Sequence, residues 1–161
     1  MTPTRTALTR IALVSALMTG LTALAPAPAG AATLSPRARM YRATNNSRVH
    51  HDIRRVGMHW QISRLARKHS IKMATTPDGT GGFGKLFHTN NPASYYLKGV
   101  SWSTWGENVG VTGGSVADLQ QAFMNSSPHR ANIMNKRFQR VALGTYRDED
   151  GLLWVTVFFY G

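Results

Sequence analysis

The sequence predicts an α+β domain in which helices come first and a β-hairpin comes last. Amphipathic helical patterns lie at residues 60–74 and 116–125. Residues 138–160 instead read as two strands around an Asp150-Gly151 turn. The chain contains no cysteine, so a single domain of this length must be stabilised by its hydrophobic core rather than by disulfides.

Residues 1–32 have the order of a secretory signal peptide. Arg5 and Arg10 give a positive start, residues 11–24 form an apolar run, and a stretch of Pro, Ala and Gly follows. The run is shorter than the roughly 20 residues of a membrane span, although an uncleaved anchor is the alternative interpretation. Because a twin-arginine pair is absent, the Sec route is favoured. We expect a secreted mature domain over residues 33–161.

The first two helices are expected at residues 36–50 and 60–74. Ser35 and Pro36 form a start signal for the first, whose apolar face is weak. The second carries its apolar positions on one stripe with a period of 3.6 residues. The members of this stripe are Ile62, Leu65, Ala66, His69 and Met73. Residues 77–101 are rich in Gly, Asn, Pro and Ser, and we expect a long loop that is functional or contains short secondary structure.

The second half of the domain begins with a helix over residues 116–125 that Ser115 caps. Ser127 and Pro128 then resemble an N-cap and first helical residue for a short helix ending near Asn135. Strands follow at residues 138–146 and 152–160. The last strand is apolar on both faces, which predicts that other elements cover it on both sides.

A glycine-rich stretch from Gly79 to Gly84 matches the GxGxxG dinucleotide fingerprint and nearly forms a P-loop with Lys85. Both motifs require a strand before them and a helix after them. Here a predicted helix precedes the stretch, and Leu86 stands where the P-loop needs Ser or Thr. We therefore reject nucleotide binding. The HExxH and GxSxG signatures are also absent.

Two of the six histidines, together with one glutamate, are candidates for a shared site. His88 lies in the predicted loop, where the backbone is free to orient it. His129 lies at a helix start, where the positive end of the dipole favours a neutral ring that can bind metal. Glu107 lies among apolar residues, so its carboxyl group is either buried with a partner or functional. By contrast, we interpret His69 as a hydrogen-bonded core histidine.

Five ordered motifs of this chain resemble those of the CAP superfamily, the cysteine-rich secretory, antigen 5 and pathogenesis-related proteins, whose domain is also called SCP. The resemblance is closest to the bacterial, disulfide-free type and covers about residues 36–161. The motifs are Leu65–Ser70 with Met73, Leu86–Asn90, Gly106–Asn108, Phe123–Met134 and Leu153–Phe158.

The resemblance implies a three-layer α-β-α sandwich with a small, mostly antiparallel sheet. It also implies a cleft with two histidines, which can bind zinc, and two acids. Carried over to this chain, the ligands are His88 and His129 and the first acid is Glu107. The second acid falls near Ser126, which is not acidic. The site is then at most His, His and Glu, lined by Ser126 and Asn108, with weakly held Zn²⁺.

The residues and the resemblance leave three functions open. The first is a non-enzymatic, monomeric module that binds a small molecule, a lipid or a cell-envelope polymer. The second is a hydrolase in which Zn²⁺ activates water and Glu107 accepts the proton; a Ser126- or Ser127-based variant with His129 ranks below it.

The third function is adhesion to anionic envelope polymers. It rests on charge: the chain has 19 Lys and Arg against 7 Asp and Glu, a net charge of +12. Residues 37–72 hold ten of the basic side chains and one acidic side chain. Such charge could also simply keep an exported protein soluble. Export disfavours intracellular nucleic acid as a partner. The candidate adhesion residues are Arg54, Arg55, Arg64, Arg67 and Lys68.

Overall fold

The computed structural model describes residues 33–80, 82 and 84–161, and residues 33–161 form one compact unit. The predicted signal peptide lies outside the described residues. The elements are α1 (Pro36–Val49), β1 (Gly57–Met58), α2 (Trp60–Thr75), α3 (Pro92–Tyr96), β2 (Trp105–Thr112), α4 (Val116–Asn125), α5 (Ser127–Met134), β3 (Arg140–Arg147) and β4 (Leu153–Tyr160).

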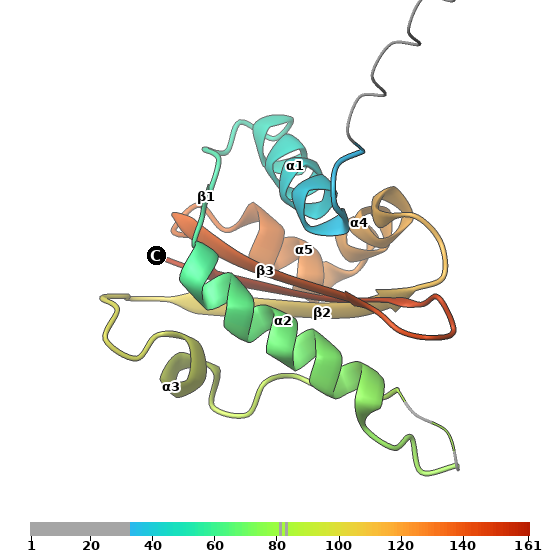
Figure 1. Cartoon of the computed structure of the whole chain (residues 1–161). Helices are drawn as coiled ribbons and strands as arrows, with labels where there is room; N and C mark the ends of the chain where they lie inside the picture. The colour runs from blue at the N-terminus through green and yellow to red at the C-terminus, as the bar shows by residue number, and fades with distance from the viewer. Residues whose placement is uncertain (1–32, 81, 83) are drawn as a thin grey trace, which may run out of the picture. The chain divides into compact units, whose positions relative to one another are not determined.

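The fold is a three-layer α-β-α sandwich, as predicted (Figure 1). Its sheet has the strand order β1-β3-β4-β2. β4 pairs antiparallel with both β3 and β2, and the two-residue β1 adds a parallel pair with β3. The sheet is therefore mixed, with the long pairings antiparallel. One face is covered by α1, α4 and α5, and the other by α2 and α3 (Figure 1).

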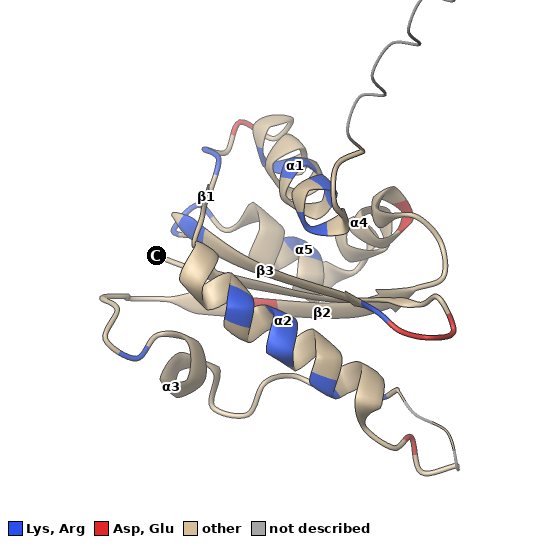
Figure 2. Ribbon diagram, viewed as in Figure 1, with Lys and Arg blue, Asp and Glu red and all other residues tan. Residues whose placement is uncertain are grey.

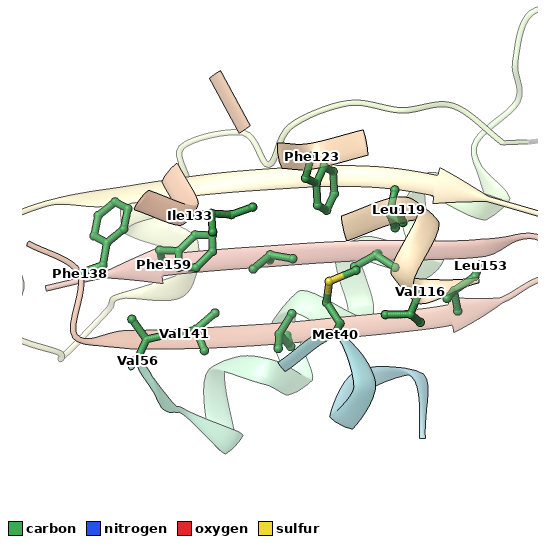
Figure 3. Close-up of a cluster of buried hydrophobic side chains, with 13 residues drawn as sticks. Met40, Val56, Val116, Leu119, Phe123, Ile133, Phe138, Val141, Leu153 and Phe159 are labelled. Carbon is green, nitrogen blue, oxygen red and sulfur yellow. The ribbon is translucent and has the colours of Figure 1, made fainter. Parts of the chain in front are cut away.

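The last strand explains why the sheet needs both layers. All eight residues of β4 are buried, as the apolar character of both its faces predicts. Leu153, Val155, Val157 and Phe159 belong to the core beneath α1, α4 and α5, where Met40 and Phe123 also pack (Figure 3). Trp154 and Phe158 face the α2 layer instead.

Strand β2 and helix α3 were not predicted. The stretch that forms β2 contains Gly106, Asn108 and Gly110, which are poor strand formers. Its glycines serve packing: a Cβ on Gly110 would come within 2.8 Å of Leu119 and 2.9 Å of Phe123 on α4. Helix α3 lies within the long loop, which thus contains short structure.

Helix starts are partly as predicted. Ser35 accepts a hydrogen bond from the Ala38 N–H, and Ser115 forms a reciprocal capping box with Asp118. The cap of α5 was wrong by one residue: Ser126 is the N-cap and Ser127 is already helical, and neither side chain makes a capping bond. After Gly84, the chain continues without a helix up to Pro92, which agrees with rejecting a P-loop.

One member of the basic segment is a core residue. Arg48, at the end of α1, is 0% exposed. Its guanidinium donates to the carbonyl oxygens of Arg54, Ile133 and Asn135 at 2.8–2.9 Å, and to that of Phe138 at 3.3 Å. Its charge is therefore not part of the surface, and only the other basic side chains of residues 37–72 are available for adhesion.

Candidate functional site

The carboxylate of Glu107 is the best-anchored polar group of the candidate site. It lies on β2, and its side chain is 2% exposed. Oε1 accepts from the backbone N–H of Thr89 at 2.9 Å, and Oε2 accepts from the hydroxyls of Thr89 at 2.7 Å and Tyr96 at 3.1 Å. Burial and the charge of Glu107 raise the pKa of Tyr96, so this hydroxyl stays protonated and donates.

His88 supplies the fourth hydrogen bond to this carboxylate. Its Nδ1 lies 2.9 Å from Oε1 of Glu107, while its own side chain is 61% exposed. The contact assigns the proton to Nδ1, because a carboxylate accepts. Nε2 is then the ring nitrogen left for a ligand. A carboxylate behind an imidazole is the arrangement that orients metal-binding histidines in many proteins.

The site opens over the edge of the sheet at β2. A hollow of about 350 Å³ is lined by His88, Glu107, Pro92, Trp105, Gly106 and Asn132. Alternate residues of β2 face opposite layers, so Glu107 is directed to α3 and Asn108 to α5. The Asn132 amide donates to Oδ1 of Asn108 at 2.8 Å and to the Glu107 carbonyl at 3.2 Å. Since a Cβ on Gly106 would collide with Asn132, glycine permits this approach.

His129 approaches the same edge from the other layer. It is the third residue of α5, and its carbonyl oxygen accepts from the Asn108 amide at 3.0 Å. Its ring lies half-buried against Phe123, with centroids 5.0 Å apart. Burial lowers the pKa of His129, and the charge of His88 lowers it further. The ring is thus neutral as predicted, but the first cause is burial rather than the helix end.

The serine-based arrangement does not form. Among the described residues, no hydrogen bond joins the hydroxyl of Ser126 or Ser127 to His129. Ser126 caps α5 through its backbone, whose carbonyl oxygen accepts from the N–H of Arg130 at 2.8 Å. The predicted core histidine behaves as expected: Nε2 of His69 lies 2.9 Å from the Phe87 carbonyl oxygen, and the ring is buried.

The donor set available to a metal is small. Within residues 33–80, 82 and 84–161, no group of three or more His, Cys, Asp or Glu side chains could hold an ion. Glu107 directs both oxygens to protein donors, so it stands behind His88 rather than beside it. What remains are the two imidazoles of His88 and His129, the nitrogen ligands that the sequence predicted for Zn²⁺.

Comparison with known proteins settles the family. The model of the cysteine-rich secretory protein family, CAP, matches residues 41–159, which is more than half of the chain. The chain belongs to the CAP family. The cysteine-free sequence makes it a member without disulfides. A Bacillus subtilis relative, the uncharacterized protein YkwD, is 35% identical over 60 residues, which cover 37% of this chain and 23% of YkwD.

Solved structures show the CAP fold in bacterial proteins described as extracellular or outer-surface. An SCP-domain protein of Bacillus anthracis has a TM-score of 0.58 at 23% identity, covering 78% of this chain and 40% of its own. An outer surface protein of Borrelia burgdorferi has a TM-score of 0.66 at 16% identity, and the match covers 78% of this chain and 91% of the Borrelia chain. The chain thus spans less than half of the YkwD and Bacillus anthracis chains. In the described part of this CAP protein, no helix has the length and apolarity to cross a bilayer.

The five candidate adhesion residues are exposed, but they lie on two different parts of the fold. Figure 2 shows Lys and Arg on both α1 and α2, which cover opposite faces of the sheet. Arg64, Arg67 and Lys68 share α2, whereas Arg54 and Arg55 lie in the connection before β1. The only ion pair among the described residues is the one between His88 and Glu107, so these five side chains have no carboxylate partner there.

The hydrogen-bonding roles of three residues in the site were not predicted from the sequence. Thr89 and Tyr96 hold Glu107, and Asn132 links β2 to α5. Thr89 and Asn132 lie within the quoted family motifs, which is the signal that could have found them. The aromatic ring of Tyr96 predicts stacking on a ligand or packing, and its bond to Glu107 has no local signal because β2 was itself not predicted.

Proposed function

We propose that this CAP protein is an extracellular binding module whose cleft at the edge of β2 contacts its ligand through His88. The observation that carries the proposal is the hydrogen-bond set of Glu107. Four donors from three residues surround a carboxylate that is almost fully buried. Such a group positions the imidazole of His88 and presents its Nε2 to whatever enters the hollow.

The same observation argues for binding over hydrolysis. A general base needs a lone pair within hydrogen-bond reach of the reacting water. Both oxygens of Glu107 are already directed to Thr89, Tyr96 and His88. The metal-assisted hydrolase is therefore less well supported than the binding module.

A divalent metal is compatible with this module. His88 and His129 would hold Zn²⁺, with water completing the shell. When bound, the ion would supply positive charge that polarises a ligand oxygen. The test is the zinc content of purified wild type beside His88→Ala and His129→Ala. We expect zinc to fall in both variants, and equal zinc in all three proteins would remove the metal from the proposal.

A second candidate function, charge-driven adhesion, is favoured by the exposed and unpaired side chains of Arg64, Arg67 and Lys68 on α2. The ligand of this surface would be an anionic envelope polymer. Binding of this kind falls steeply with salt, because it releases counterions. Binding in the cleft depends instead on the imidazole of His88, which adhesion through α2 does not need.

Retention on isolated bacterial cell walls distinguishes the two functions. Wild type, His88→Ala and the exposed control His50→Ala are compared at low and at high salt. The binding module predicts retention that is lost only in His88→Ala, whatever the salt concentration at which retention is measured. Retention that disappears with salt and is equal in all three proteins would overturn the proposal that the cleft binds the ligand, and would support adhesion instead.

A further inference from the structure

A second hollow also borders His88. It has a volume of about 190 Å³ and lies between α2 and the segment that precedes α3. Its charged wall is formed by Lys68 and Lys72, and its other wall by Phe87, His88, Asn90 and Tyr95. Because His88 also lines the hollow at β2, the two hollows meet at this residue.

The lysines of this hollow share one face of α2. They are four residues apart, so their side chains lie one turn from each other. Nζ of Lys72 lies 5.6 Å from the centre of the Phe87 ring, a cation–π distance that holds the ammonium at the hollow. Burial is the main cause that lowers the pKa of His69 beneath this hollow, and the charges of Lys72 and His88 lower it further.

The wall of the hollow that Phe87 forms is held in place by His69 of α2. The buried ring of His69 bonds the Phe87 carbonyl oxygen at 2.9 Å and meets the Phe87 ring edge-on, with centroids 5.3 Å apart. This contact ties the segment before α3 to α2, so that the hollow is bounded on both sides. Asn90 is exposed at its rim and adds an amide N–H donor.

The charges in this hollow have no counter-charge in the described structure. Among the described residues, neither lysine pairs with an acid, and the carboxylate of Glu107 is enclosed by its own donors. Lys68 and Lys72 both line this hollow, and their flexible side chains can bring two ammonium groups to a tetrahedral oxyanion. We propose that this hollow binds the phosphate group of a phosphorylated ligand whose remainder extends past His88 into the cleft.

This inference rests on the proposed function, because it names the acidic group of the ligand for the same cleft. Phe87 and Tyr95 add an aromatic surface for the part of the ligand next to the phosphate. A phosphate ester can come from a soluble molecule or from a lipid headgroup, and the chemistry in the hollow is the same for both.

The test follows the His88 and Phe87 proton resonances during titration with inorganic phosphate and with glycerol phosphate. The proteins are wild type, the Lys68→Met, Lys72→Met double variant and the exposed control Lys136→Met. We expect saturable shifts in wild type and in the control, with affinity about tenfold or more weaker in the double variant, because charge-assisted hydrogen bonds are lost. Thermal unfolding verifies that the variants remain folded.

Vesicles of phosphatidylglycerol and of phosphatidylcholine distinguish a lipid headgroup from a soluble molecule as the source of the phosphate. Lysine-dependent retention on the first but not the second assigns the phosphate to a lipid headgroup, whereas shifts with soluble esters alone assign it to a soluble ligand. Equal shifts in wild type and the double variant, or no shifts at all, would overturn the inference. If wall retention still depends on His88 in that case, the proposed function stands without this subsite.

Discussion

Arg48 and Ile133 join the two ends of the helical layer across 85 residues of sequence. The guanidinium Nη1 of Arg48 donates to the carbonyl oxygen of Ile133 at 2.8 Å. Burial lowers the pKa of Arg48, and the nearby charge of Arg54 adds to this effect. Among the residues that the structure describes, no carboxylate pairs with this charge; backbone carbonyl oxygens surround it instead. This side chain therefore connects α1 to the end of α5 and to the segment that leads into β3.

Arg48→Met should destabilise the protein severely. The variant leaves the carbonyl oxygens of Ile133, Asn135 and Phe138 without their donor in a buried region, which costs about 3 kcal/mol or more. Urea unfolding measures the loss. The matched control is Arg42→Met, on the exposed face of the same helix, which should change stability by no more than about 0.5 kcal/mol. Similar unfolding midpoints for both variants would contradict a central role for Arg48.

Glu107→Gln should destabilise the fold even though it preserves shape. A glutamine amide has one oxygen acceptor and directs N–H groups at donors that the carboxylate accepted, so at least one hydrogen bond from Thr89 or Tyr96 is lost. We expect a loss of about 2 kcal/mol in unfolding free energy. Glu149→Gln, in the exposed β3–β4 turn, is the control. A variant as stable as the control would mean that the four-donor arrangement contributes little.

Gly144→Ala should disrupt the contact between β3 and α2. A Cβ at this position would overlap the backbone of Ala66 and Arg67, which no side-chain rotation relieves. Overpacking of this kind costs about 3 kcal/mol. At Gly113 the nearest atom to a new Cβ lies 3.4 Å away on Leu152, so Gly113→Ala serves as the tolerated control. The thermal unfolding midpoints of the two variants are compared. Equal midpoints would show that α2 can shift to accommodate the new Cβ at residue 144.

The sequence predicted elements whose signal is local. β4 was found because both its faces are apolar, and α2 because its stripe repeats every 3.6 residues. β2 was missed because Gly106 and Gly110 weaken the strand signal. These glycines allow α5 and α4 to pack closely against the strand. Arg48 illustrates the same limit: a charge run predicts a solvated surface, and only the tertiary fold brings four carbonyl oxygens around one guanidinium.

The candidate site divides in the same way. Glu107 was singled out because an acid among apolar residues needs a partner. Which partner it has depends on long-range contacts: Thr89 and Tyr96 are 18 and 11 residues away, and α3 was not predicted. His88 and His129 were also singled out from the sequence, but spacing alone could not bring them together, and it was the family resemblance that predicted one shared site.

Stability should fall as the pH drops from about 7.5 to about 5.5. Burial is the main cause that lowers the pKa values of His69, His59 and His129. An unfolded histidine takes up its proton near pH 6.5, whereas these folded ones do so only at lower pH. Below about pH 6.5 the unfolded state therefore binds more protons, and the stability that is fully present above this value is progressively lost.

His69 should contribute most to this slope, because it is the most buried of the three. The charges of Lys72 and His88 lower its pKa further, while the hydrogen bond to Phe87 and the charge of Glu107 oppose the shift. His69→Gln keeps an N–H donor for the Phe87 carbonyl but cannot titrate. Its urea midpoint should vary less over this pH range than that of wild type or of the exposed control His50→Gln. Identical pH profiles for all three proteins would show that His69 does not drive the acid sensitivity.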